Sequence, residues 1–109
     1  RDVFLTIIGG LKVNEPALDL AIIVAIISSL LDQPLDQKVA VVGEVALTGE
    51  LRSVPKLENR LLELTKMGYK KVIVPEKSKS KALEKLDISI IYATDVRTVI
   101  SHLFRFNKG

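Results

Sequence analysis

The side chains with the clearest chemical potential are lysines that crowd the second half of the chain. Glu76 and Glu84 interrupt them, and Arg60 and Lys66 precede them on a predicted helix. The lysines are Lys70, Lys71, Lys77, Lys79, Lys81 and Lys85. A surface that gathers such ammonium groups binds phosphates without regard to sequence. A solvated helix face that keeps the protein soluble is the alternative. Because no aromatic platform for stacking bases accompanies the lysines, both interpretations stay open.

Catalytic side chains are harder to assemble from this sequence. His102 is the only histidine and the chain has no cysteine, so a typical zinc site and structural disulfides are excluded. A serine nucleophile requires an activating base. Ser28 and Ser29 lie inside an apolar stretch without one, and we expect them to bond back to helix carbonyls. Glu44 and Glu50 lie across a predicted hairpin, and nothing in the pattern places them in a shared pocket.

The elements that position these residues begin with a predicted buried strand over residues 3–8, closed by Gly9-Gly10. The glycine pair lacks the third glycine and the Gly-Lys-Ser/Thr of a phosphate-binding loop, so we interpret it as a turn. Asn14 or Glu15 caps the next helix, with Pro16 in its first turn. Residues 17–31 are apolar nearly all round, which predicts a buried core helix too short to span a membrane.

The second half of the chain alternates strands and helices. A loop over residues 32–38 precedes a strand at 39–42 and a hairpin over 44–54 that turns at Thr48-Gly49. An amphipathic helix starts at Leu57 and stops at Gly68. Strands at 72–74 and 88–92 flank a short basic helix at 77–86, and Thr94 or Asp95 caps a last helix. This order predicts a mixed α/β domain whose later strands are parallel.

Composition bounds the class of protein. The 109 residues are 48% hydrophobic with a net charge of +3, which fits one domain over residues 1–109 and permits contact with nucleic acid without demanding it. The absence of cysteine favours a reducing, cytosolic compartment, and no signal-peptide pattern opens the chain. Because the first residue is Arg1 rather than Met, we expect a fragment of a longer protein.

Several short motifs occur in a fixed order along nearly the whole chain. They are Asp2-Val3-Phe4, Gly9-Gly10-Leu11-Lys12, Glu15-Pro16-Ala17-Leu18-Asp19-Leu20-Ala21, Ser28-Ser29, Gly43-Glu44-Val45-Ala46-Leu47-Thr48-Gly49-Glu50-Leu51-Arg52-Ser53-Val54 and Gly68-Tyr69-Lys70-Lys71-Val72-Ile73-Val74-Pro75. In order and spacing they resemble the C-terminal Lon-protease-like domain of the RadA (Sms) family of bacterial DNA repair proteins, from about Asp2 to Leu103. The resemblance implies a fold of the ribosomal-protein-S5-domain-2 type.

The resemblance also implies where a peptidase centre would lie. True Lon peptidases read Gly-Pro-Ser-Ala-Gly at this helix start, and their serine is the nucleophile. The matching position here is Ala17, and Glu58 stands nearest to the position of the Lon lysine base. A serine–lysine dyad needs a hydroxyl and an amine that can be neutral. We therefore expect no protease activity from this fragment, with a shifted dyad of Ser28 or Ser53 with Lys56 as a remaining alternative.

The family implies a parent protein with further domains. RadA-type proteins resemble RecA-like ATPases, with an N-terminal zinc finger and a central ATPase, and process branched DNA intermediates as hexameric rings in the bacterial cytoplasm. Neither zinc-finger cysteines nor an ATP-binding loop is in this sequence, so no cofactor is expected in this fragment, and ATP, Mg²⁺ and Zn²⁺ belong to absent domains. The implied partners are DNA, bound without sequence preference, further copies of the chain and the RecA recombinase, but no membrane.

Three functions follow as expectations. The first is a scaffold and DNA-contact domain supporting the hexamer, with the basic side chains as contacts. Those candidates are Arg60, Lys70, Lys71, Lys77, Lys79, Lys81 and Lys85. The second is a pure oligomerisation module, whose exposed apolar side chains form a ring interface. The third is the residual peptidase.

Overall fold

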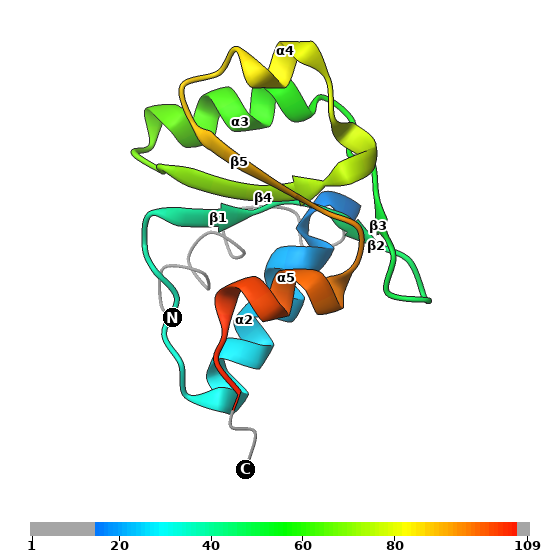
Figure 1. The fold of residues 1–109 in the computed structure, drawn as a ribbon, viewed down its shortest axis with the longest axis vertical. Helices are drawn as coiled ribbons and strands as arrows, with labels where there is room; N and C mark the ends of the chain where they lie inside the picture. The colour runs from blue at the N-terminus through cyan, green and yellow to red at the C-terminus, as the bar shows by residue number, and fades with distance from the viewer. Residues whose placement is uncertain (1–14, 107–109) are drawn as a thin grey trace.

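A three-stranded parallel sheet forms the centre of the molecule. The computed structural model describes residues 15–106, and its sheet has the order β1-β4-β5, with β1 at Val39–Val41, β4 at Lys71–Pro75 and β5 at Ser89–Ala93 (Figure 1). Val41, Ile73 and Ile91 are in register across it. Helical segments connect strands that run in the same direction, as the alternation in the sequence predicts. The mixed α/β class is confirmed.

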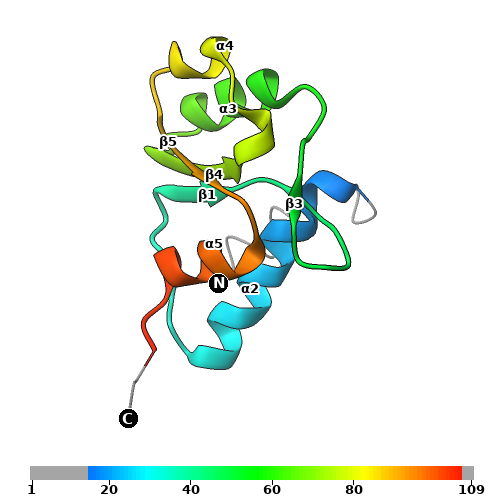
Figure 2. The ribbon, with the colours of Figure 1, turned by 45° about the vertical axis from the view of Figure 1, so that its right-hand side comes forward.

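Helices cover both faces of this sheet. The α2 (Asp19–Leu31) and α5 (Val96–Leu103) helices lie on one face, and α3 (Leu57–Lys66) and α4 (Lys81–Glu84) lie on the other (Figures 1 and 2). The central strand β4 serves both layers because side chains alternate along a strand. Ile73 packs with α2 and α5, whereas Val72 and Val74 pack with α3 and α4. Two apolar cores therefore share one sheet.

A short hairpin joins the helix start to the end of the sheet. It consists of β2 (Glu44–Val45) and β3 (Leu51–Arg52), paired antiparallel, and the positive φ of 90° at Gly49 allows its turn. The Leu51 N–H donates to the Thr94 carbonyl at 2.9 Å, and the Val96 N–H donates to the Gly49 carbonyl at 2.9 Å. The predicted hairpin over 44–54 is confirmed with shorter strands, and it is anchored beyond β5.

The helix predicted over residues 77–86 is wrong in its extent. Two short pieces replace it, η2 (Glu76–Ser78) and α4 (Lys81–Glu84), with extended backbone at Ser80 between them. The Ser80 hydroxyl accepts from the Leu83 N–H at 3.4 Å and caps α4. Serine competes for backbone groups in this way, which favours a cap over a helix interior. The basic segment is consequently two turns with different directions.

The prediction of a fully buried core helix is wrong for the outer side of α2. Leu20 and Val24 are completely buried, but Ile26 is 54% exposed and Leu30 is 78% exposed. The sheet and α5 cover only one side of the helix, so an apolar composition all round does not guarantee burial all round. The 3-10 turn η1 (Pro16–Leu18) precedes the helix, and the side chain of its cap residue Glu15 makes no cap hydrogen bond.

The end of α2 also corrects the role expected for its serines. The Ser28 hydroxyl donates to the Gln33 carbonyl at 2.6 Å, which lies beyond the helix, and Ser29 is exposed. Asp32 adopts a left-handed conformation with φ 54° and ends the helix. Ser28 therefore stabilises the turn after the helix and does not bond back to a helix carbonyl.

Other start and stop signals are confirmed. Asp95 caps α5, and Gly68 has a φ of 96° two residues after α3. The predicted strand at 3–8, the Gly9-Gly10 turn and Asn14 lie outside the described residues. Within residues 15–106, no helix is both long enough and apolar enough to cross a membrane.

Candidate functional site

Ala17, which the resemblance matches to the Lon serine, is a buried part of the η1 turn. Its side chain is 4% exposed, and its carbonyl accepts from the Gly43 N–H at 3.2 Å. The Gly43 carbonyl accepts from Leu20 N–H at 3.0 Å, and an Asp19 carboxylate oxygen accepts from Val45 N–H at 3.1 Å. Gly43 and the hairpin therefore fix this helix start with hydrogen bonds, and the side chain at its buried position 17 is a methyl group.

Glu58, which the resemblance matches to the Lon lysine, is exposed in the first turn of α3. Lys56 precedes that helix in a left-handed conformation with φ 56° and is also exposed. Arg60, on the next turn, forms an ion pair with Glu15 and donates to the Pro55 carbonyl at 3.3 Å. The helix start and α3, the two segments that would carry a dyad, are therefore in contact. The contact between them is an ion pair between Glu15 and Arg60 and contains no serine or lysine.

The shifted serine–lysine alternative receives little support from these positions. Ser28 lies ten residues along from Leu18, so the helical rise places it about 15 Å from the helix start. Its hydroxyl already donates to the loop after α2. Ser53 is exposed and close to Lys56 in sequence, without a hydrogen bond to it within the described residues. Neither serine has a hydrogen bond to an amine among the described residues, and a serine nucleophile needs such a base.

The basic side chains do not form one continuous patch. Lys70 and Lys71 lie at the start of β4, where both backbone N–H groups donate to the Lys38 carbonyl. Lys77 follows the other end of that strand, about 16 Å away along it. Lys81 and Lys85 are exposed on and after α4. The sequence predicts these lysines as one basic stretch, but in the structure β4 and the two short helical turns separate them.

Three of the candidate cations already have partners. Arg60 binds Glu15, Lys77 binds Glu50, and the Lys79 ammonium lies 5.3 Å from the centroid of the Tyr92 ring. No ion pair is found for the other four candidates within the described part of the chain. Those four are Lys70, Lys71, Lys81 and Lys85.

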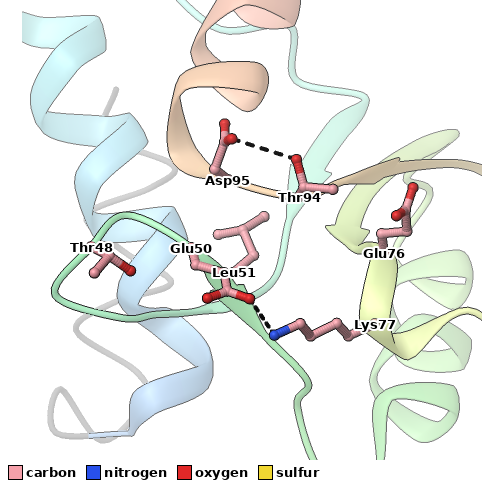
Figure 3. Close-up of a pocket in the computed structure, with 7 residues that line it drawn as sticks. All are labelled: Thr48, Glu50, Leu51, Glu76, Lys77, Thr94 and Asp95. Carbon is pink, nitrogen blue, oxygen red and sulfur yellow. Dashed lines mark hydrogen bonds and ion pairs between the residues drawn. The ribbon is translucent and has the colours of Figure 1, made fainter.

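A pocket lies at the carboxyl ends of β4 and β5, where the hairpin meets the sheet. Its volume is about 360 Å³, and it is lined by Thr48, Glu50, Leu51, Glu76, Lys77, Thr94 and Asp95 (Figure 3). The carboxyl ends of parallel strands are a common place for ligands in open α/β sheets. This pocket could not be predicted from the sequence, because its walls come from segments that only the strand crossover and the hairpin bring together.

The carboxylates of this pocket are already engaged. The hydrogen bond from Lys77 and its positive charge lower the pKa of Glu50. The Thr98 N–H donates to Asp95 at 2.8 Å, and this contact with the backbone is the main reason that the pKa of Asp95 is lowered. Both groups are therefore ionised in neutral solution. Glu50 links the hairpin to Lys77, and Asp95 caps α5.

Side chains that could ligate a metal are scattered over the described residues. Within residues 15–106, no three His, Cys, Asp or Glu side chains are grouped closely enough to hold an ion. His102 is exposed in the last turn of α5. The resemblance implies Mg²⁺, Zn²⁺ and ATP for other domains of the parent protein.

Comparison with known proteins agrees with this arrangement. A family model described as subunit ChlI of Mg-chelatase matches residues 8–78. The chain is 39% identical over 104 residues to the DNA repair protein RadA of Streptococcus pneumoniae, covering 95% of this chain and 25% of that protein. It is 41% identical over 105 residues to RadA of Haemophilus influenzae, covering 94% and 23%. With RadA of Escherichia coli it shares 48% identity over 75 residues, covering 69% and 16%.

The relatives share one name, and two of the three matches cover 94% or more of this chain. The chain spans about a quarter or less of the length of these RadA proteins. The family model covers the helix start at Ala17, the hairpin and β4, which are the elements that carry the resemblance to a Lon-like domain. The chain belongs to the ChlI-type domain family, as the Lon-like C-terminal region of RadA-type DNA repair proteins.

Proposed function

We propose that this chain is a non-catalytic scaffold and DNA-contact domain of a RadA-type DNA repair protein. The observation that carries the proposal is the set of four exposed lysines without ion pairs in the described residues, Lys70, Lys71, Lys81 and Lys85. Ammonium groups that no carboxylate neutralises release the most counterions when they bind phosphates. Such contacts read no base edges, so binding is independent of sequence.

The helix start and α3 support the non-catalytic part of the proposal. Ala17 offers no nucleophile, and the backbone around it is fixed by Gly43 and Leu20. Glu58 carries the wrong charge for a lysine's role, and Arg60 cannot lose its proton. In the proposed function, these segments keep the shape of a peptidase and no longer perform its reaction.

The test is a comparison of DNA affinity between two variants with equal charge loss. Replacing Lys70, Lys71, Lys81 and Lys85 with glutamine is expected to weaken binding to a labelled single-stranded oligonucleotide and to flatten its salt dependence. Each lost phosphate contact reduces the slope of log K against log salt by about 0.7. In the control, glutamine replaces the paired cations Arg52, Arg60, Lys66 and Lys77. A larger loss of affinity in the control would refute the assignment.

The action of the whole protein is part of the same proposal. Branch migration of recombination intermediates by an ATP-driven hexamer, with the RecA recombinase as a partner, is proposed for the longer protein. This chain then supplies DNA contacts and support for the ring, while ATP, Mg²⁺ and Zn²⁺ are bound in other parts of the parent. In a full-length protein, the four-lysine variant is expected to lose DNA stimulation of ATP hydrolysis while its basal hydrolysis is unchanged.

A pure oligomerisation module is the second candidate, and exposed apolar side chains favour it. Ile26 and Leu30 lie one helical turn apart on α2, and Met67 and Phe106 are more than half exposed elsewhere. Apolar groups left in water are typical of surfaces that bind another protein. Sedimentation velocity over a concentration series tests this function, and Ile26→Ser with Leu30→Ser is expected to abolish any association. DNA affinity that depends on the four lysines would favour the first candidate.

A further inference from the structure

The outer strand of the described sheet, β5, has one exposed side. The central strand β4 is completely buried from Val72 to Pro75, whereas Ser89 is exposed and Ile90, Ile91 and Tyr92 are only half-buried. Figure 1 shows β5 passing in front of β4, with α4 above it and α5 below it. In the strand order β1-β4-β5, β5 pairs with β4 alone. Its second side is therefore an edge of the sheet.

The hydrogen-bond pattern shows which backbone groups this edge presents. The Ser89 N–H donates to the Lys70 carbonyl at 3.1 Å. In a parallel pair, alternate residues turn both backbone groups toward the neighbouring strand. Ser89, Ile91 and Ala93 therefore face β4, and the N–H and C=O groups of Ile90 and Tyr92 point away from it. No other backbone partner for those two residues is found within residues 15–106.

The edge carries none of the features that normally block pairing. Sheet edges are usually protected by lysine, proline, bulges or a covering element. The β5 sequence Ser-Ile-Ile-Tyr-Ala has no charge and no proline. The backbone hydrogen bond from the hairpin lies beyond the end of the strand, where the Leu51 N–H donates to the Thr94 carbonyl. The five residues of β5 remain open as a template for one more strand.

The charge beside the edge identifies the kind of strand that fits. The Lys79 ammonium lies over the Tyr92 ring, and Lys81 and Lys85 are exposed on and after α4. Glu84 lies on the same side, and its charge adds to burial in raising the pKa of Tyr92. Asp87, two residues before β5, is a second carboxylate near this edge, so three cations against two carboxylates leave the flank positive. A second copy would bring its own lysines to the same flank, and like charges disfavour that pairing.

We propose that β5 is a docking site for an extended, acidic segment of another protein, which adds to the sheet as a strand. Main-chain hydrogen bonds to Ile90 and Tyr92 would supply affinity, and carboxylates near the α4 lysines would supply specificity. Nucleic acid does not fit this edge, because its backbone has no regular series of amide donors and carbonyl acceptors. This docking is a function separate from the proposed DNA contact, although Lys81 and Lys85 take part in both.

The test uses the 109-residue chain and a labelled ten-residue peptide that alternates glutamate and valine. Amide spectra of the ¹⁵N-labelled protein are recorded during titration, and hydrogen exchange is measured with and without peptide. In the free protein, the Ile90 and Tyr92 amides are expected to exchange fast, while Ser89 and Ile91 are protected. With saturating peptide, exchange at Ile90 and Tyr92 is expected to slow at least about tenfold. An unchanged rate, or shifts confined to other residues, would overturn the proposal.

Two matched changes separate strand addition from simple charge attraction. Ile90→Pro removes an outward N–H that the sheet does not use, and proline is tolerated at such an edge position. It is expected to weaken peptide binding about tenfold. A peptide with alternate N-methyl groups removes donors from the other side and needs no change in the protein. Equal affinity for the unmethylated and the N-methylated peptide would overturn the proposal.

Two further measurements address the other occupants of the edge. Protection of Ile90 and Tyr92 that rises with protein concentration alone would show pairing with a second copy and overturn the proposal. A single-stranded oligonucleotide that slows exchange at these two amides would assign the edge to nucleic acid and overturn it as well. The proposal instead expects the oligonucleotide to leave both amides unprotected.

Discussion

The junction between the helix start and the hairpin gives the sharpest test of the structure. A Cβ atom added at Gly43 would lie 3.4 Å from the Leu20 Cδ2 atom and 3.4 Å from the Pro75 Cγ atom. These distances are at the tight end of ordinary contact, so the neighbouring side chains must shift slightly. The φ at Gly43 is not positive, so alanine is compatible with the backbone. The effect of Gly43→Ala is therefore steric, and it depends on Leu20.

The expected energies follow from burial and contact. Leu20 is completely buried, so Leu20→Ala should lower the free energy of unfolding by about 3–5 kcal/mol. For a chain of 109 residues the whole free energy of unfolding is about 5–16 kcal/mol. Mild overpacking by Gly43→Ala should cost about 1 kcal/mol. Leu20→Ala removes the contact with the Leu20 Cδ2 atom, so the cost of Gly43→Ala in the Leu20→Ala protein should fall to about half. The coupling free energy between the two substitutions is then about 0.5 kcal/mol.

Urea unfolding followed by far-ultraviolet circular dichroism measures all four proteins of this cycle. The matched control cycle combines Gly43→Ala with Val24→Ala, because Val24 is equally buried on α2 but is not among the nearest atoms to the added Cβ. The control should be additive within about 0.3 kcal/mol. If the Leu20 cycle is equally additive, or if Gly43→Ala is stabilising, the close approach of α2, the hairpin and β4 is wrong.

Three other outcomes are expected from contacts at the ends of elements. Glu15→Gln should lower the free energy of unfolding by about 1 kcal/mol, because its ion pair with Arg60 is about one-third exposed, and 1 M salt should reduce the difference in urea unfolding. Gln33→Ala should speed hydrogen exchange at Arg105, because the Gln33 side chain accepts from its N–H and donates to its carbonyl; unchanged exchange would contradict this clamp. Because the pKa of Asp95 is lowered in the folded protein, its carboxylate stabilises the fold fully above the unfolded pKa, and this stabilisation is lost as the pH falls below about 4. In urea unfolding at a series of pH values, Asp95→Asn should flatten the decline of the midpoint on the acid side. An unchanged pH profile in this variant would argue against the cap.

Local signals in the sequence predicted most of the fold because they depend on neighbouring residues. The Asp95 cap, the Gly68 stop and the hairpin at Gly49 each need only a few adjacent residues, and all are found. The α3 helix begins at Leu57, as its apolar spacing indicates. The errors occur where tertiary contacts decide. The exposed side of α2 depends on what packs against it, and periodicity carries no information about that.

The candidate site could be predicted only in part for a related reason. The resemblance matches Ala17 and Glu58 to the two residues of a peptidase dyad, but only the structure shows that Glu15 and Arg60 join their segments. Similarly, the lysines are close in sequence, yet the length of β4 separates Lys71 from Lys77. Residues at the start of a strand and residues just after it lie at opposite ends of the sheet. Lysines that are close in sequence therefore do not combine their charges on one surface.

The pairing of charges also explains how one basic segment can serve more than one contact. Lys77 is held by Glu50 at the hairpin, and Lys79 lies over Tyr92, so both contribute to the fold. Lys81 and Lys85 have no such partner among the described residues and are exposed on and after α4. Because an ammonium group that a carboxylate neutralises attracts phosphate weakly, the partner of each lysine predicts its role better than its place in the sequence. A contact with DNA or with an acidic segment should therefore depend on the lysines of α4 more than on Lys77.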